Sequence, residues 1–493
     1  MGTARGLNAE GGGRFREVFA REGYDEAGLV DTLGPIRLPG RLGRDRTYFR
    51  DRTGRGRPLD ALVRLFLLGL PEDLDVARRA LAPLAPEEWE GAGLIAIEGN
   101  QVRGLVRMMA FRKLLLASDH QEGPEAQARL DQVMGMTSST VTLANFTVRR
   151  AVRSALDLGT GSGVQAFLAA AHSDRVWATD SSPRAIEFAR FNAAFNGCAE
   201  KVELLEGDTF EPVRGRTFDL IVSNPPFALT PSRRFAYRDS GVPLDGFARA
   251  LIRHGASCLN EGGFCQIVCD WAHIAGQDWK ERVAEWFSGT GCDAWVMRTD
   301  TQDAAGYART WIGDTEEAGE EESTRLYDEW VAYYASVGIE AVSTGLIAIR
   351  KAGGRRNWLR IEDAPATTSG AFGESVLGAF GVRDSLEAAD GAALLAAKFR
   401  VAQSVRLDQV AEWEDGSWRI RSAKIRLAQG LQYKSDIDLR LAGMVALCDG
   451  RRTLGEVLAE AAQAMGEDLD RITPHCVALM RELVERGFLV AVG

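Results

Sequence analysis

Short apolar runs alternate with stretches of helical spacing through the middle of the chain. The runs with the length and composition of buried strands lie at residues 155–158, 175–180, 218–222, 263–269, 294–298 and 346–350. Residues 182–197, between two of these runs, have a helical pattern with Pro183 near its start and Gly197 at its stop. Proline at the start and glycine at the stop are usual signals of helix ends. The alternation of strands and helices predicts an α/β domain.

The first run leads into a glycine-rich turn. Asp157 lies near its end, glycines follow at every second position, and a helical pattern begins at Val164. Glycine suits such a turn because it tolerates unusual backbone angles and lets a ligand lie against bare peptide groups. The next run ends in Asp180, roughly twenty residues on, where a carboxylate would accept hydrogen bonds from the hydroxyls of a nucleoside ribose. The sequence therefore predicts a nucleotide-sized site.

A second motif follows about sixty positions later, where the run at residues 218–222 ends in Ser223-Asn224-Pro225-Pro226-Phe227. An amide or a ring amine is a poor nucleophile because its lone pair is delocalised. The Asn224 side-chain oxygen and the Pro225 carbonyl together provide two acceptors that can hold both N–H bonds of such a group and direct its lone pair. Phe227 can stack on a planar substrate. The motif therefore favours chemistry on a planar NH₂ group.

The two motifs together carry a resemblance to a known family. A glycine turn and a strand-end acid do not separate NAD from S-adenosylmethionine, but the Asn-Pro-Pro-Phe tetrapeptide does. With it, residues 140–350 resemble the class I S-adenosylmethionine-dependent methyltransferases, in particular the branch with the release-factor glutamine N5-methyltransferases and the rRNA N-methyltransferases. The resemblance implies a Rossmann-like, seven-stranded, mostly parallel sheet with ligands at the carboxyl ends of its strands. It also implies S-adenosyl-L-methionine as cofactor and S-adenosyl-L-homocysteine as product.

The same resemblance implies the residues of the site. The cofactor-binding set is Asp157, Gly159, Thr160, Gly161, Gly163, Asp180, Ser181, Asp208, Thr209 and Asn224. Within it, Asp157 is expected at the amino group of the cofactor, Asp180 at the ribose and Asp208 at the adenine amino group. The catalytic set is Asn224, Pro225, Pro226 and Phe227. Phe227, Tyr237 and Arg238 are expected at the substrate, although a purely structural loop explains Tyr237 and Arg238 equally well.

Both flanks lie outside the resemblance, and we expect three domains, at residues 1–117, 118–351 and 352–493. Near the N-terminus, helical patterns at residues 59–68 and 75–84 precede a hairpin signal at residues 93–102. Near the C-terminus, an Asp415-Gly416 turn between two tryptophans precedes three helical patterns and an apolar run. Helices followed by a small hairpin predict winged-helix-like α+β modules, which bind nucleic acid in many proteins and only dock partners in others.

Composition limits the partners. A net charge of −10 argues against nonspecific coating of nucleic acid. Eight arginines within residues 37–57, with Tyr48 and Phe49 among them, form either a phosphate-binding segment or a solvated loop. The seven cysteines show no ligand-pair spacing and the five histidines are scattered, so we predict no metal site. Cys265 and Cys269 are interpreted as buried, apolar thiols. Because no run approaches the ~20 apolar residues of a membrane span, we expect a cytoplasmic protein.

Several functions stay open at this point. We predict an S-adenosylmethionine-dependent N-methyltransferase whose acceptor is a protein glutamine amide or a nucleobase exocyclic amine. A small-molecule methyltransferase of specialised metabolism is one alternative. A non-catalytic, nucleic-acid-binding regulator with a vestigial cofactor fold is another, although a regulator has no need of the Asn224 amine-binding motif. The oligomeric state is not predicted.

Overall fold

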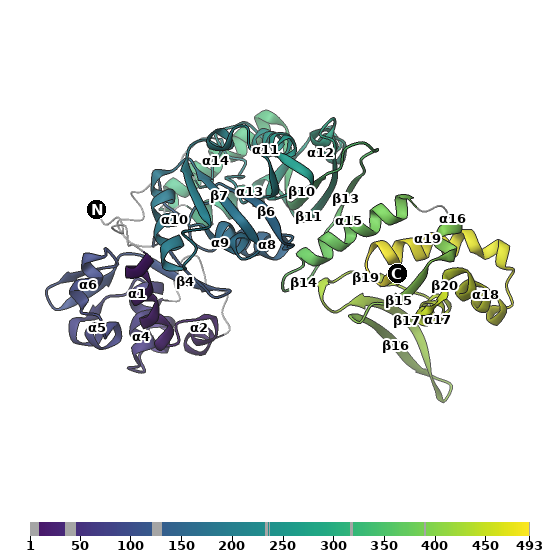
Figure 1. The fold of residues 1–493 in the computed structure, drawn as a ribbon, viewed down its shortest axis with the longest axis horizontal. Coiled ribbons are helices and arrows are strands. Elements are labelled where there is room, and N and C mark those ends of the chain that lie inside the picture. Colours follow the sequence, from purple (N-terminus) through teal and green to yellow (C-terminus); the bar gives the residue numbers. More distant parts are fainter. Residues whose placement is uncertain are drawn as a thin grey trace. The chain divides into compact units, whose positions relative to one another are not determined.

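A mixed sheet of eight strands lies at the centre of the catalytic region in the computed structural model (Figure 1). Its order is β13-β11-β12-β10-β9-β6-β7-β8. The strands are β6 (Val152–Leu158), β7 (Ser173–Asp180), β8 (Val202–Glu206), β9 (Phe218–Ser223), β10 (Leu259–Ile274), β11 (Cys292–Asp303), β12 (Ile339–Lys351) and β13 (Leu359–Asp363). β6 to β10 pair in parallel, and β12 is antiparallel to both of its neighbours. The predicted Rossmann-like α/β fold is confirmed.

The expected number of seven strands is wrong by one. β13 adds a strand at the edge beside β11, beyond the predicted sheet. Its side chains are mostly half-buried rather than buried, so the sequence shows no apolar run at this position. Polar contacts hold the chain there, as described below for Asp293.

The structure describes residues 9–34, 46–120, 131–231, 235, 237–315, 319–388 and 391–492. Two compact units make up the chain: Met1–Ala144 with Arg150–Glu362, and Asn145–Arg149 with Asp363–Gly493. The first unit therefore holds both the N-terminal module and the catalytic sheet. The division into three domains that end at residues 117, 351 and 493 stays a prediction.

Helices connect the strands of the sheet and contribute side chains to the apolar core that packs against it. They are α8 (Ser138–Phe146), α9 (Val164–Ala170), α10 (Pro183–Phe195), η3 (Glu211–Val213), α11 (Gly246–Ser257), α12 (Trp279–Ala284) and η4 (Glu285–Phe287). Every residue of α9 is buried. Cys265 and Cys269 are buried in the apolar core of β10, which confirms their interpretation as apolar thiols. Two more helices, α13 (Ala304–Thr315) and α14 (Glu320–Val337), form an insertion between β11 and β12.

The N-terminal module contains helices and two small sheets. Its elements are α1 (Ala9–Arg21), α2 (Glu26–Leu33), α3 (Arg46–Arg52), α4 (Pro58–Leu62), η2 (Val63–Leu67), β1 (Glu72–Asp73), α5 (Leu74–Leu81), α6 (Pro86–Gly91), β2 (Ile95–Glu98), β3 (Gln101–Gly104), β4 (Arg107–Phe111) and β5 (Leu114–Ser118). The predicted hairpin is confirmed as β2–β3. The β4–β5 hairpin was not predicted, because its turn uses Arg112 and Lys113 at positive φ instead of Asn-Gly.

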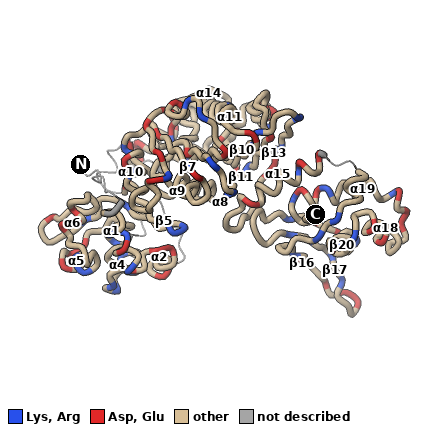
Figure 2. Tube along the Cα trace, in the orientation of Figure 1, with Lys and Arg blue, Asp and Glu red and all other residues tan. Residues whose placement is uncertain are grey.

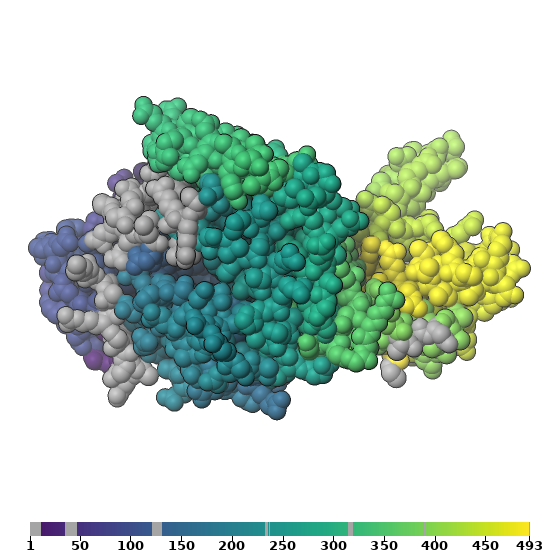
Figure 3. Space-filling view, turned by 90° about the horizontal axis from the view of Figure 1, so that it is seen from above, coloured from purple at the N-terminus to yellow at the C-terminus, as the bar shows by residue number. Residues whose placement is uncertain are grey.

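The second unit combines helices with short sheets. Its elements are β14 (Thr368–Ser369), α15 (Gly373–Ala388), α16 (Gly391–Ala396), β15 (Lys398–Val401), β16 (Val405–Glu414), β17 (Ser417–Leu427), β18 (Gly430–Leu431), β19 (Lys434–Asp436), α17 (Leu439–Ala446), β20 (Asp449–Thr453), α18 (Leu454–Met465), α19 (Leu469–Glu485) and β21 (Leu489–Val492). The predicted Asp415-Gly416 turn joins β16 to β17, and this hairpin projects from its unit (Figure 3). α19 begins before its predicted start at Pro474, because Asp468 caps it.

Charges of both signs are spread along the chain. Lys and Arg alternate with Asp and Glu over the traced elements (Figure 2). Within the described ranges, every helix is too short or too polar to span a bilayer.

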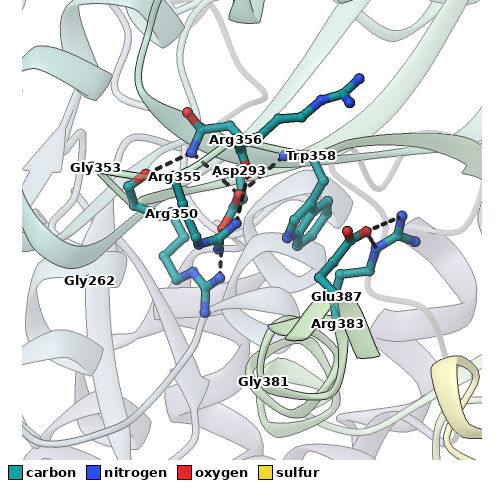
Figure 4. Close-up of polar contacts among 12 residues, drawn as sticks. Gly262, Asp293, Arg350, Gly353, Arg355, Arg356, Trp358, Gly381, Arg383 and Glu387 are labelled. Carbon is teal, nitrogen blue, oxygen red and sulfur yellow. Dashed lines mark hydrogen bonds and ion pairs between the residues drawn. The ribbon is translucent and has the colours of Figure 1, made fainter. Parts of the chain in front are cut away.

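Asp293, at the start of β11, fixes the chain that leads into β13 (Figure 4). Its carboxylate is fully buried. Oδ2 accepts hydrogen bonds from the guanidinium groups of Arg350, at 2.6 Å, and Arg355. Oδ1 accepts from the Trp358 backbone N–H at 3.2 Å. One carboxylate therefore joins β11, the end of β12 and the segment that precedes β13.

Substitution of Asp293 tests whether its hydrogen bonds stabilise the first unit. Asp293→Ala leaves the largely buried Arg350 guanidinium without its carboxylate, so the free energy of unfolding of the first unit should fall by about 3 to 5 kcal/mol. Arg355→Ala is the matched control, because that side chain is 37% exposed and its loss should cost about 1 kcal/mol or less. Urea unfolding measures both variants, and equal losses would contradict the assignment.

Candidate functional site

The strand register brings the two sequence motifs to one edge of the sheet. Leu158, the last residue of β6, pairs with Thr179 of β7 on one side and with Ser223 of β9 on the other. The glycine turn, Asp180 and Asn224 each follow directly from these paired positions. Because parallel strands end at a common edge, the three groups emerge side by side.

The glycine turn is open on the side away from the sheet. Gly159 and Gly161 have φ of 71° and 53°, and a Cβ built on either would meet no atom within 4 Å. Gly163, at φ 93°, has a different role, because a Cβ there would overlap the Phe167 ring. The first two glycines therefore leave bare backbone exposed to a ligand, and the third allows the following helix to pack.

Asp157 makes hydrogen bonds to the glycine turn and to the helix that follows it. Its Oδ2 accepts hydrogen bonds from Thr160 Oγ1 at 2.7 Å and from the Ala166 N–H at 2.9 Å. Burial raises the pKa of this carboxyl to about 7, against the lowering effect of both hydrogen bonds. Asp157 thus joins the turn to α9. Its contact with the amino group of a cofactor stays a prediction.

Asp180 holds the turn from the neighbouring strand. Its Oδ2 accepts from the Gly161 N–H and its Oδ1 from the Ser182 N–H, both at 2.9 Å. Burial raises the pKa of this carboxyl, and the backbone hydrogen bonds oppose the rise. Ser181 also donates a backbone hydrogen bond to this carboxylate. Because a carboxylate has about four acceptor positions, three backbone donors leave it able to accept from a ribose hydroxyl. Ser181 lies exposed directly after Asp180.

Asp208 and Thr209 lie beyond the end of the next strand along. Asp208 is exposed, and Thr209 adopts a positive φ of 44°. The Thr209 carbonyl accepts a hydrogen bond from Thr179 Oγ1 at 3.2 Å. The predicted cofactor residues thus follow the ends of β9, β6, β7 and β8, in that order along the sheet edge, and their individual roles stay predictions.

Asn224 presents a buried side-chain acceptor just beyond the end of β9, and its role toward an amine stays a prediction. Its Nδ2 donates to Ser139 Oγ at 3.2 Å and to Thr140 Oγ1 at 3.4 Å, both in α8. Its Oδ1 is buried and has no hydrogen-bond partner among the described residues. A buried amide oxygen without a partner is costly, and a donor from a ligand removes the cost. Sequence reasoning missed Ser139 and Thr140, although four consecutive hydroxyl residues from Thr137 were a visible signal.

The residues after Asn224 form the adjoining wall. Pro225 is buried, whereas Pro226 and Phe227 are half-buried. The Phe227 ring meets Trp311 of α13 edge to face, with ring centroids 6.1 Å apart. Trp311 was not predicted, because it lies in the insertion that the family resemblance does not specify.

Two tyrosines of the α13–α14 insertion make hydrogen bonds to the backbone that follows Phe227. The Leu229 N–H donates to the Tyr307 hydroxyl at 3.2 Å, and its carbonyl accepts from the Tyr334 hydroxyl at 2.7 Å. Tyr307 in turn donates to the buried carboxylate of Asp270 at 2.5 Å. α13 and α14 therefore fix the position of the backbone that directly follows the Asn-Pro-Pro-Phe motif.

Arg238 is buried further along the segment that follows Leu229. Its guanidinium is 2% exposed and pairs with Asp239 at 2.6 Å. It also lies over the rings of Phe235 and Trp330, at 4.8 Å and 5.3 Å from their centroids. Tyr237 is half-buried beside Phe235, with ring centroids 5.5 Å apart. The substrate contacts of Tyr237 and Arg238 stay predictions, and the structure gives Arg238 a packing role in addition.

Known proteins match the same region. The Methyltransferase small domain family matches residues 136–277. The chain is 32% identical over 237 residues to a release factor glutamine methyltransferase of Geobacter sulfurreducens, a match that covers 44% of this chain and 76% of the relative. The chain belongs to the class I S-adenosylmethionine-dependent methyltransferases.

Other matches agree on the catalytic domain and differ in acceptor. A release factor glutamine methyltransferase of Moorella thermoacetica is 35% identical over 27% of this chain, which spans about half, 54%, of that relative. Ribosomal RNA small subunit methyltransferase C of Klebsiella pneumoniae is 39% identical over 23% of this chain and 30% of its own length. Two domains of unknown function match the flanks of the enzyme, DUF7059 at residues 21–105 and DUF7782 at residues 380–491.

The residues of the methyltransferase fit its donor, S-adenosyl-L-methionine. The open faces of Gly159 and Gly161 leave room against the backbone, and Asp180 offers an anionic acceptor beside them. When bound, the donor supplies an electrophilic methyl group on a sulfonium. The unpartnered Asn224 Oδ1 lies at the same sheet edge, where it is available to an acceptor group.

Asp180→Ala should weaken donor binding. The variant loses a charge-assisted contact, which corresponds to about 1.5 to 3 kcal/mol of affinity for S-adenosylhomocysteine. Because Asp180 also supports Gly161, calorimetry should include a 2′,3′-dideoxy analogue of the ligand. The parent should bind this analogue more weakly, whereas the variant should not distinguish the two ligands. If the variant still distinguishes them, the ribose assignment is wrong.

Asp270 should give the enzyme a stability that falls with rising pH. Burial raises the pKa of its carboxyl from the ordinary 3.8 to about 7, so the folded state binds this proton more tightly than the unfolded chain. Its contribution is therefore lost between about pH 4 and pH 7. Asp270→Asn should make stability less dependent on pH in that range, as measured by urea unfolding at several pH values. The exposed Glu321→Gln is the control, and a slope unchanged by Asp270→Asn would contradict the assignment.

Proposed function

We propose that the enzyme methylates the side-chain amide nitrogen of a glutamine in a protein. The observation that carries the proposal is the buried Oδ1 of Asn224, which lacks a partner among the described residues. The relatives named as glutamine methyltransferases support this acceptor, and the one named as an rRNA methyltransferase supports amine methylation in general. A cytoplasmic location is part of the proposal.

The chemistry assigned to the chain is positioning. Ser139 and Thr140 fix the Asn224 amide, so that its Oδ1 accepts one N–H of the substrate amide. The Pro225 carbonyl accepts the other. With both N–H bonds held, the nitrogen lone pair is directed away from them, and Phe227 packs against the planar group. A bound donor would supply the methyl carbon that this nitrogen attacks, with the carbon–sulfur electron pair left on sulfur, and one N–H proton of the methylated amide would pass to solvent.

Two features of the N-terminal module favour a protein acceptor over a nucleic acid. Residues 35–45 of the arginine-rich segment lie outside the described residues. In the described part, Arg52 donates to the Thr32 carbonyl, and Arg55 and Arg57 both pair with Asp31. These arginines already have internal partners, so they are poorly placed to neutralise phosphates.

The acidic helix α6 also favours a protein acceptor over a nucleic acid. The N-terminal sheet has the order β1-β3-β2, with α5 and α6 between β1 and β2. This order supports the winged-helix-like interpretation, in which α6 takes the recognition position. α6 carries Glu87, Glu88 and Glu90, all exposed. Glu88 pairs with Arg14 at 3.0 Å, and the carboxylates of Glu87 and Glu90 still disfavour a phosphate backbone and suit a basic protein surface.

The second unit supports the same interpretation with a rearranged chain order. Its sheet has the order β20-β15-β21, with α18 and α19 between β20 and β21. The middle strand, β15, precedes the other two in sequence, whereas in the N-terminal module the middle strand comes last. Both flanks are therefore proposed as winged-helix-like docking modules, one before and one after the catalytic domain in the sequence.

Neither alternative function is favoured. A small-molecule acceptor leaves the two flanking modules without a role in recognition. A non-catalytic regulator does not require an Asn224 whose amide is anchored by two hydroxyls. The relatives described above are all named as methyltransferases.

Labelling identifies the acceptor class. The enzyme, S-adenosylmethionine with a radioactive methyl group and a cell lysate are incubated together, and label is followed into protein, RNA and small molecules. Label should enter protein, and peptide mass spectrometry should place one added methyl group on a glutamine. Label confined to RNA or to small molecules would overturn the glutamine proposal. Lysate treated with Asn224→Ala enzyme is the matched control.

Asn224→Ala should separate binding from chemistry. The variant loses the acceptor for the substrate N–H, so turnover should fall about 100-fold or more, the scale for one preorganised polar contact. S-adenosylhomocysteine affinity should stay within about twofold. Ser139→Ala removes only one anchor of the Asn224 amide and should cost less. Loss of donor affinity in parallel with turnover would instead indicate a folding defect.

A further inference from the structure

Helix α10 links the N-terminal module to the catalytic domain. Phe188, Phe191 and Phe195 of this helix belong to the same buried apolar core as Phe15 and Phe19 of the module. Phe191 and Phe195 stack with ring centroids 5.4 Å apart. The module is therefore packed on the catalytic domain along one face of α10.

Asn192 of α10 and Asn196, the residue that caps its end, complete the edge of β5 as a neighbouring strand would. Asn196 accepts from the Leu115 N–H at 2.9 Å and donates to the Leu115 carbonyl at 2.8 Å. Asn192 makes the same pair with Ala117, both at 2.8 Å. Four residues of helix advance about 6 Å, and two residues of strand about 6.7 Å, so the spacings agree. Side-chain amides thus satisfy a strand edge that burial would otherwise leave unpaired.

Asn192 makes a third hydrogen bond that reaches the glycine turn, whereas the third hydrogen bond of Asn196 goes to the Asn192 carbonyl at 2.9 Å. The Asn192 Nδ2 also donates to the Ser162 carbonyl at 2.9 Å. Ser162 lies in the glycine turn, between Gly161 and Gly163, which both have positive φ. Asn192 is fully buried. One amide therefore joins the backbone of the N-terminal module to the backbone of the donor-binding turn.

We infer that Asn192 is a positioning residue through which the N-terminal module sets the donor turn. Asp157 and Asp180 hold Thr160 and Gly161 from the sheet, and Asn192 holds the next residue, Ser162, from α10. Asparagine suits the position because it offers one acceptor and two donors; a carboxylate would face two carbonyls without a proton. Donor binding and order in the β5 edge are therefore coupled, and by linkage the coupling acts in both directions.

Two matched variants test the inference. Asn192→Ala and Asn196→Ala each remove a pair of hydrogen bonds to β5, and only Asn192→Ala also frees the Ser162 carbonyl. Both should lower the urea midpoint. The dissociation constant for S-adenosylhomocysteine should rise about tenfold in Asn192→Ala, the effect of one buried hydrogen bond, and by less than about twofold in Asn196→Ala. An unchanged constant in folded Asn192→Ala, or an equal rise in both variants, would overturn it.

A measurement on the parent enzyme keeps the inference testable if Asn192→Ala does not fold. Hydrogen exchange is followed by mass spectrometry with and without S-adenosylhomocysteine. Ligand should slow exchange in residues 114–118 more than in residues 95–104, the β2–β3 hairpin of the same module. Equal protection of the two segments, or none, would overturn the inference. S-adenosylhomocysteine alone is the probe and no methyl acceptor is present, so failure of the glutamine proposal does not affect the result.

Discussion

Because Leu158 pairs with Thr179 on one side and with Ser223 on the other, three strands of this methyltransferase end in register. The common edge on which the two sequence motifs meet follows from this pairing. The glycine turn, the carboxylate of Asp180 and the amide of Asn224 reach one edge without any strain in the strands. A register shift of one residue would turn each of these side chains to the opposite face of the sheet.

Buried polar side chains then fix what the register brings together. Asp157, Asp180 and Asn192 each make a hydrogen bond to the glycine turn, at Thr160, Gly161 and Ser162. Burial raises the pKa of both carboxyls, so the fold bears an electrostatic cost to keep these contacts. In return, the bare peptide face of Gly159 and Gly161 is held in place before any ligand arrives, and this preorganisation favours binding.

Local signals in the sequence were sufficient for the strands, the two motifs and the Asp415-Gly416 hairpin, because each depends on a few adjacent residues. Hydrogen-bond partners that lie far apart along the chain could not be predicted from the sequence. Ser139 lies 85 residues from Asn224, and Ala117 lies 75 residues from Asn192. The β13 strand and the Arg112-Lys113 turn were missed for a different reason. Each departs from the residue preferences of its element, and contacts made elsewhere compensate.

The chain order of the second unit constrains how that unit can be divided. β15 lies between β20 and β21, and it pairs with both. A fragment that begins at α17 lacks this middle strand, so β20 and β21 would each have an unpaired edge and no contact with one another. Exposed edges of this kind invite pairing with other chains. The smallest piece able to form the sheet therefore extends from β15 to β21 and includes the projecting β16–β17 hairpin, which is inserted within it.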